Sequence, residues 1–301
     1  MKRAVVAFIL ILAGVFALFT MLDRNGDFVA ERDLWRINNR FAKASRDPQI
    51  VPDSTFRQIV ADYNAFIQQY PESHLARVAH ILIGRVYMVK GDLAKGREKY
   101  EEVAKLYADE PKIAVEAVAD IGRTYAIENN AQGVIQNYER VIREYPLTMH
   151  GMQAPILLTK LHASRGDTQR AQDAYRAGIA HYQKLIKEYP GGSTEFNALR
   201  SMGTLYLAGG DRRKAIETFG KVLINFSDQK YMTSKRVATI VRTINTVAIV
   251  DLKDYDFPLS IYREFIKAHP QHPYRPRFEQ IIESIELLKE SKVTLDTAPQ
   301  R

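Results

Sequence analysis

The feature that most constrains this chain is a short pattern that recurs along its middle. A glycine is followed three residues later by a tyrosine at Gly84-Tyr87, Gly122-Tyr125 and Gly203-Tyr206. A second aromatic residue stands thirteen positions after each of these tyrosines, at Tyr100, Tyr138 and Phe219. A degenerate copy has Thr159, His162 and Tyr175. Because a pattern with a nearly fixed spacing marks one supersecondary unit, the chain is expected to stack several similar units.

Each copy predicts two helices joined by a tight turn. Between Arg77 and Pro111, apolar residues recur with helical spacing on both sides of a break at Gly91-Asp92, and Pro111 is expected to end the copy. The other copies break at Asn129-Asn130, Gly166-Asp167 and Gly210-Asp211. We expect the glycines of the pattern to let the paired helices approach closely, while the aromatic residues fill the space between them.

Two flanking regions extend the array. Residues 27–46 and 54–70 predict one helical pair, and residues 233–253 and 258–269 predict another. A last helix at 276–290 has one apolar stripe and one charged face, which suits a helix that caps a solenoid. The sequence therefore predicts an all-α fold, with a repeat domain at residues 26–290 and a polar tail at residues 291–301.

This arrangement resembles the tetratricopeptide repeat (TPR), a right-handed superhelical solenoid of antiparallel helix pairs. The TPR signature has a small residue at position eight, which here is Gly84, Gly122, Thr159 and Gly203. Position twenty, usually Ala or Gly, is Gly96, Val134, Ala171 and Ala215. The position-eight residues are 38, 37 and 44 residues apart, so the second helix of the third copy is expected to be longer and to reach Tyr189. Repeat endings such as Gln69-Tyr70-Pro71 resemble those of bacterial envelope TPR proteins, including the lipoproteins of outer-membrane barrel assembly.

The first residues predict a membrane anchor at residues 1–25. The 19 residues from Ala4 to Leu22 carry no charge, and a helix of this length spans roughly 30 Å. Lys2 and Arg3 precede them, which favours a cytoplasmic N-terminus. We expect a single-pass inner-membrane protein with a periplasmic repeat domain; a cleaved signal peptide is the alternative. Because the chain has no Cys, it differs from the barrel-assembly lipoproteins in having no residue for N-terminal lipid modification.

Positive charge is concentrated in one part of the chain. Between Lys160 and Arg242 there are 15 Lys and Arg against 7 Asp and Glu, an excess of +8 that equals the net charge of the whole chain. Such a surface suits an acidic protein, an anionic lipid or an anionic wall polymer. The alternative is a solvated surface that is basic without having a partner.

The sequence carries no motif for catalysis. It has no phosphate loop, no nucleophile elbow and no paired-carboxylate motif. His269 and His272 have a metal-like spacing, but Pro270 prevents a single helical face and no carboxylate is fixed nearby in the sequence. We therefore expect no enzyme activity, no cofactor and no metal. The pI of about 9.4 alone does not indicate a nucleic-acid partner, because no binding motif accompanies it.

The resemblance also implies a binding groove, because the first helix of each TPR pair lines the concave face. Position nine of three successive copies is Arg85, Arg123 and Lys160, so a stack of repeats is expected to align these cations in one column. Arg200, at position five, is expected to extend the column, with Ile81 and Ile156 as an apolar floor. Arginines in such a place suit the carboxylates of a bound peptide or helix. The alternative is that these cations pair with neighbours such as Glu116.

These observations predict a scaffold or adaptor for protein–protein interactions in a bacterial envelope complex. Two alternatives remain open. One is a secreted or outer-membrane-associated TPR module in outer-membrane protein assembly. The other is a binder of anionic wall polymer or lipid through the basic surface of residues 160–242.

Overall fold

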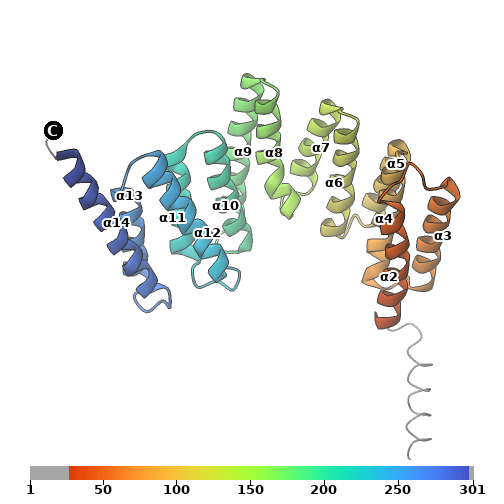
Figure 1. The fold of residues 1–301 in the computed structure, drawn as a ribbon, viewed down its shortest axis with the longest axis horizontal. Coiled ribbons are helices and arrows are strands. Elements are labelled where there is room, and N and C mark those ends of the chain that lie inside the picture. The colour runs from red at the N-terminus through yellow and green to blue at the C-terminus, as the bar shows by residue number, and fades with distance from the viewer. Residues whose placement is uncertain (1–26, 298–301) are drawn as a thin grey trace, which may run out of the picture. The chain divides into compact units, whose positions relative to one another are not determined.

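The computed structural model describes residues 27–297, and within them every regular element is a helix (Figure 1). Helices that follow each other in the chain pack as antiparallel pairs, and pairs stack on pairs. This confirms the all-α, TPR-like solenoid. The expected membrane anchor at residues 1–25 lies outside the described residues. None of the helices from residue 27 onward is long and apolar enough to cross a membrane.

The chain forms two compact units, and the repeat domain predicted over residues 26–290 includes parts of both. The first unit ends at Val141 and the second begins at Ile142, so the boundary falls within α7. The helices that begin in the first unit are α2 (Asp27–Ala44), α3 (Asp53–Gln69), α4 (His74–Lys90), α5 (Leu93–Leu106), α6 (Pro111–Ile127) and α7 (Ala131–Glu144).

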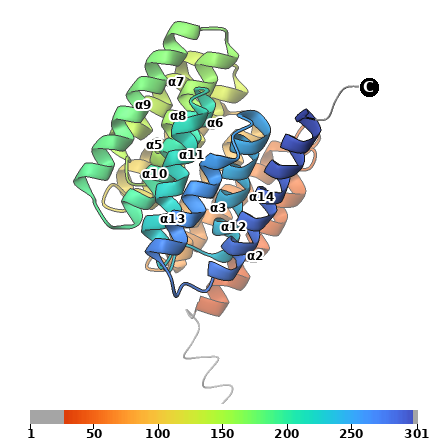
Figure 2. The ribbon, with the colours of Figure 1, turned by 90° about the vertical axis from the view of Figure 1, so that its left-hand side faces the viewer.

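The second unit continues the same alternation of helices and short turns. In it α10 packs against both α9 and α11 (Figure 2). Its elements are α8 (Met149–Ser164), α9 (Thr168–Glu188), α10 (Ser193–Ala208), α11 (Arg212–Phe226), α12 (Ser234–Asn245), a π-helical segment η1 (Thr246–Asp251), α13 (Asp256–Ala268) and α14 (Arg275–Thr297).

First helices of neighbouring pairs also touch each other, which is the packing that positions the site. α4 contacts α2 and α6 in the first unit, and α8 contacts α10 in the second. Small residues on these helices are completely buried, among them Ala79, Ala117 and Ala198. Side chains on the opposite side of these first helices therefore share one face of each unit.

The turns inside the four copies share one backbone conformation. The first residue of each break has a left-handed backbone, as at Gly91 (φ 92°) and Asn129 (φ 55°), a conformation that costs most other residues free energy. The next residue caps the second helix: Asp92 Oδ1 accepts a hydrogen bond from the Lys95 backbone N–H at 3.2 Å, and Asn130 accepts one from Gly133. The Gly-Asp and Asn-Asn pairs of the first three copies are thus turn and cap together, whereas the Asp211 side chain in the fourth copy makes no capping hydrogen bond.

The glycines of the repeat pattern are close-packing sites, as predicted. A Cβ placed on Gly84 would lie 2.5 Å from Cε1 of Tyr100, and one on Gly203 would lie 2.9 Å from the Phe219 ring. Both distances are far below van der Waals contact. The aromatic residue of the second helix therefore occupies the space that the missing side chain leaves.

The second copy departs from the predicted register by one residue. Asn137 faces Gly122 in place of Tyr138, and its amide donates a 2.9 Å hydrogen bond to the Val118 carbonyl. In the same helix Gly133, and not Val134, packs against the Tyr125 ring. A shift of one residue turns a helix by about 100°, so α7 presents a different set of side chains to α6.

Three boundaries also differ from expectation or refine it. Pro111 is the first residue of α6 and does not end the copy before it, because a proline fits the first turn of a helix, where its missing N–H is not needed. α9 has 21 residues, which confirms the longer second helix of the third copy. α14 continues to Thr297, so the segment expected as a polar tail is helical over most of its length.

Candidate functional site

In the first unit, the two arginines predicted at position nine, Arg85 and Arg123, form ion pairs with an acidic residue of the chain itself. Asp120, on α6, is only 2% exposed. Its Oδ2 accepts from Nε of Arg85 at 2.8 Å, and its Oδ1 lies 2.6 Å from Nη1 of Arg123. One buried carboxylate therefore bridges two arginines on neighbouring first helices. The structure brings Arg85 and Arg123 together, as the column requires, but with part of their charge already neutralised.

This pairing fixes the charge of Arg85. Burial lowers the pKa of Arg85, but the hydrogen bond and the charge of Asp120 together raise it above its ordinary value. The charge of Glu116, the partner named from the sequence, acts on Arg85 more weakly than that of Asp120. Burial, and after it the charge of Asp120, raises the pKa of the neighbouring Tyr100 phenol. The group is thus a polar cluster that is built into the packing of α4, α5 and α6.

Replacing Asp120 by Ala should lower the free energy of unfolding by about 1–2 kcal/mol, because two partly desolvated guanidinium groups lose their shared carboxylate. Urea unfolding followed by circular dichroism measures the change. Asp173→Ala is the control, because Asp173 and Arg176 form an exposed pair at 3.9 Å. An equal loss in both variants would show that the burial of Asp120 adds nothing to the pair.

The cations of the second unit are arranged differently. Lys160 is exposed on α8 and forms no ion pair with any described residue. Arg200, on α10, is partly buried, and its guanidinium lies 5.8 Å from the centre of the Phe196 ring. Neither residue has an acidic partner within the described chain. Because Lys160 belongs to the second unit and Arg123 to the first, a column through all three position-nine residues stays a prediction.

A further arginine lies beside Arg200. The guanidinium of Arg236, on α12, is also 5.8 Å from the Phe196 ring and donates to the Tyr231 carbonyl. Burial, and then the positive charge of Arg236, lowers the pKa of Arg200. Two like charges are therefore held close to one aromatic ring, and neither forms an ion pair with a carboxylate of the described residues, which is an arrangement that favours binding of an anion.

The sequence analysis did not select Asp120 in the first unit, or Phe196 and Arg236 in the second. Arg236 lies in the helical pair after the four copies, outside the signature positions. Asp120 stands three residues before Arg123, and that spacing on a helix was the available signal.

The apolar residues expected between the charges are part of the core. Ile81 is 7% exposed and Ile156 is 9% exposed, and Ile156 packs in the main cluster of the second unit. They support the helices that carry the cations, and little of their surface remains for a ligand. The neighbouring basic run of α11 is neutralised: Arg212, Arg213 and Lys214 pair with Asp251, Asp254 and Asp211, respectively.

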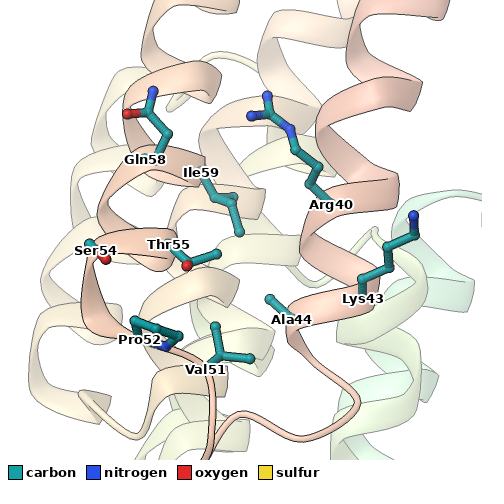
Figure 3. Close-up of a pocket in the computed structure, with 9 residues that line it drawn as sticks. All are labelled: Arg40, Lys43, Ala44, Val51, Pro52, Ser54, Thr55, Gln58 and Ile59. Carbon is teal, nitrogen blue, oxygen red and sulfur yellow. The ribbon is translucent and has the colours of Figure 1, made fainter.

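A cavity of about 610 Å³ lies in the first unit between the end of α2 and the start of α3 (Figure 3). Ala44, Val51 and Ile59 point into it, and Arg40 and Lys43 stand at its side (Figure 3). Arg40 is paired with Asp62 at 2.5 Å. The cavity has apolar walls and a cationic edge. Its polar groups do not point toward one position, so they do not define a site for a polar ligand.

The histidine pair has a carboxylate neighbour that the sequence did not indicate. Nδ1 of His269 lies 3.3 Å and Nε2 of His272 lies 3.4 Å from the oxygens of Asp228. The His269 ring also contacts the Ile224 carbonyl at 2.6 Å through Nε2, and Nδ1 of His272 accepts from the Tyr274 N–H. These contacts join α13 to the end of α11. Within residues 27–297 no group of three or more His, Asp or Glu side chains is arranged to hold a metal.

Comparison with known proteins identifies the repeat. A family model of the tetratricopeptide repeat matches residues 164–192 and 198–228. The chain therefore contains tetratricopeptide repeats, in an all-helical solenoid of the TPR type. Repeats of this family generally mediate protein–protein interactions and are typically not catalytic. No curated protein matches the chain.

Solved structures of TPR proteins are similar to this chain at low sequence identity. A thermophilic TPR protein of Thermus thermophilus is 14% identical, with 70% of this chain and 100% of that chain covered and a TM-score of 0.37. The TPR2AB domain of yeast Sti1, in a complex with pHSP90, is 12% identical over 87% and 100% of the two chains, with a TM-score of 0.32. YrrB, a TPR protein with an unusual peptide-binding site, is 11% identical over 72% and 97%, with a TM-score of 0.33.

Proposed function

We propose that this chain is a membrane-anchored TPR adaptor that captures an acidic segment of a protein partner on the first helices of its second unit. The observation that carries the proposal is the pair Arg200 and Arg236, which lies partly buried beside Phe196 and forms no ion pair with a carboxylate of the described residues. Lys160, on the neighbouring helix α8, adds an exposed and unpaired cation. Arg85 and Arg123 contribute less to binding in this proposal, because Asp120 already occupies them.

Guanidinium groups held in place by an aromatic ring are suited to carboxylates. They present several N–H donors in a fixed plane, and holding them before binding reduces the entropy lost on binding. A peptide with Asp or Glu would supply the carboxylates with which Arg200 and Arg236 can form ion pairs. We expect its apolar residues to contact the remaining surface of α8, α10 and α12, since charged contacts alone give specificity more than affinity.

The location is part of the proposal. The uncharged segment Ala4–Leu22, with Lys2 and Arg3 before it, supports an inner-membrane anchor and a periplasmic repeat domain. In this setting the chain would serve as a scaffold in a bacterial envelope complex. A secreted or outer-membrane-associated module in outer-membrane protein assembly would use the same binding surface.

The net charge of +8 in residues 160–242 favours a second candidate function, the binding of an anionic wall polymer. Ion pairs such as Arg213 with Asp254 consume part of this charge. The two functions differ in their dependence on salt. Binding of a polyanion releases many counterions and falls steeply with salt, whereas binding of a short peptide that also makes apolar contacts falls less.

We expect short peptides of alternating Glu and Leu to bind the full-length protein in detergent, and Gln-Leu peptides of the same length to bind at least about tenfold more weakly. Fluorescence anisotropy of labelled peptides measures both, and isolated wall polymer is titrated alongside over a range of salt concentrations. Equal binding of the Glu and Gln peptides would refute the adaptor proposal. Polymer binding without peptide binding would establish the second candidate in its place.

A further inference from the structure

The outer face of α2 exposes two large aromatic side chains. Phe28 is 74% exposed and Trp35 is 64% exposed, and Trp35 is the sole tryptophan of the chain. They stand seven residues apart, close to two helical turns, so they lie on one side of the helix. Large aromatic residues exposed on one face indicate a contact surface more often than single scattered ones do.

The other side of the same helix explains why these residues stay uncovered. Ala30, Leu34 and Ile37 are buried and pack in a cluster with α3, which presents Phe56, Ile59 and Tyr63. α2 therefore has one complete core face. Phe28 and Trp35 project from the opposite side, beyond the reach of α3.

Cations surround the exposed aromatic residues. Arg32 lies about one turn before Trp35 and Arg36 directly follows it; both are close to the carboxylate of Asp33, at 3.3 and 3.6 Å. Lys43 continues the exposed face towards the end of the helix and forms no ion pair with a described residue. Glu31 is the acidic residue on the exposed side. Aromatic residues flanked by Arg and Lys are the composition found where helices lie in the interface between a bilayer and water.

The sequence places this helix next to the expected anchor. The uncharged segment ends at Leu22 and α2 begins at Asp27. The intervening chain, fully extended, spans at most about 18 Å. If Leu22 lies at the bilayer surface, the start of α2 cannot be farther from that surface than this length. An exposed aromatic and basic face so close to a membrane has the bilayer as its nearest large partner.

We propose that the outer face of α2, formed by Phe28, Arg32, Trp35, Arg36 and Lys43, lies on the surface of an anionic bilayer. Phe28 and Trp35 enter the interfacial layer, and the cations contact the lipid phosphates. The inference rests on the proposed membrane anchor and adds to it a fixed contact between the first repeat unit and the bilayer. A second copy of the chain is a poorer occupant, because two such faces would bring arginines against arginines.

Trp35 itself provides the test, because it is the sole tryptophan and the tryptophan fluorescence therefore reports on this residue alone. The full-length protein is reconstituted in vesicles that contain anionic lipid, with and without brominated acyl chains, and flotation is measured in parallel. We expect the protein to float, the Trp35 emission to shift to shorter wavelength, and brominated lipid to quench it. Zwitterionic vesicles should give weaker quenching, since they lack the charge that attracts Arg32, Arg36 and Lys43.

The matched control moves the tryptophan and leaves the rest of the chain unchanged. A Trp35→Phe, Leu106→Trp protein carries its probe at a 60% exposed position on α5 of the same unit and should be quenched by acrylamide but not by brominated lipid. If the protein floats but Trp35 is quenched by acrylamide and not by brominated lipid, as in the control, the α2 proposal is refuted and the anchor proposal stands. Failure to float would overturn both. Protection of Trp35 that depends on protein concentration, without lipid quenching, would assign the face to a second copy and so refute the bilayer contact.

Discussion

Replacing Gly84 by Leu is expected to lower the free energy of unfolding by about 1–3 kcal/mol, the range for overpacking a well-filled core. The reason is geometric. The first added carbon would lie 2.5 Å from Cε1 of Tyr100, and the Tyr100 ring is completely buried between α4 and α5. The ring cannot turn aside into solvent, so the two helices must separate. Urea unfolding followed by circular dichroism and by tyrosine fluorescence measures the loss.

The control for this variant adds the same side chain where space is open. Ala94 lies on the exposed side of α5, and Ala94→Leu should leave the unfolding midpoint nearly unchanged, because leucine is also a good helix former. An unchanged midpoint for Gly84→Leu as well would mean that α4 and α5 do not pack in the register described. The comparison separates close helix contact from any general effect of a larger residue.

The sequence predicted the helices and their pairing because these depend on local signals. The spacing of Gly84 and Tyr100 fixes which faces of two consecutive helices meet, and Gly91-Asp92 supplies both the left-handed turn and the cap. These signals lie within a few tens of residues and recur from copy to copy. The bounds of α4 and α5 therefore follow closely from the pattern.

The second copy shows where such a pattern stops being sufficient. Tyr138 stands at the expected position, but Asn137 faces Gly122 because its amide also finds the Val118 carbonyl. Whether Asn137 or Tyr138 faces Gly122 depends on how far α7 is rotated about its axis. The spacing between two residues in the sequence does not determine that rotation. The repeat signature gives the position of a helix more reliably than its rotation.

The partners of the cations were predictable only in part. Arg85 and Arg123 are found on neighbouring first helices, as position nine implies, yet the sequence pointed to Glu116 where the structure selects Asp120. Both acids lie on α6 one turn apart, and which of them reaches Arg85 depends on the distance between α4 and α6. Similarly, Arg236 lies near Arg200 because both approach the Phe196 ring, and this depends on how two consecutive helical pairs pack.

Changing Lys160, Arg200 and Arg236 together to Glu is expected to weaken binding of the Glu-Leu peptides at least about a hundredfold, while helicity is retained. Each charge that attracted a carboxylate now repels it, and like charges set against each other in an interface cost several kcal/mol. Lys160 and the heads of the two arginines have no internal carboxylate to lose. Anisotropy titration gives the affinity, and circular dichroism with urea unfolding gives the fold.

Because Arg200 is partly buried, a milder variant separates binding from folding. Arg200→Gln with Arg236→Gln removes both charges without introducing a buried carboxylate, and it should weaken the peptide by about tenfold or more. The control reverses Arg212, Arg213 and Lys214, whose charges are already matched by Asp251, Asp254 and Asp211. If that control alone loses the ligand, the acidic partner binds at α11 and not at the first helices. Loss confined to the Arg200 and Arg236 variants ties recognition to these two arginines beside Phe196, which form no ion pair with a described residue.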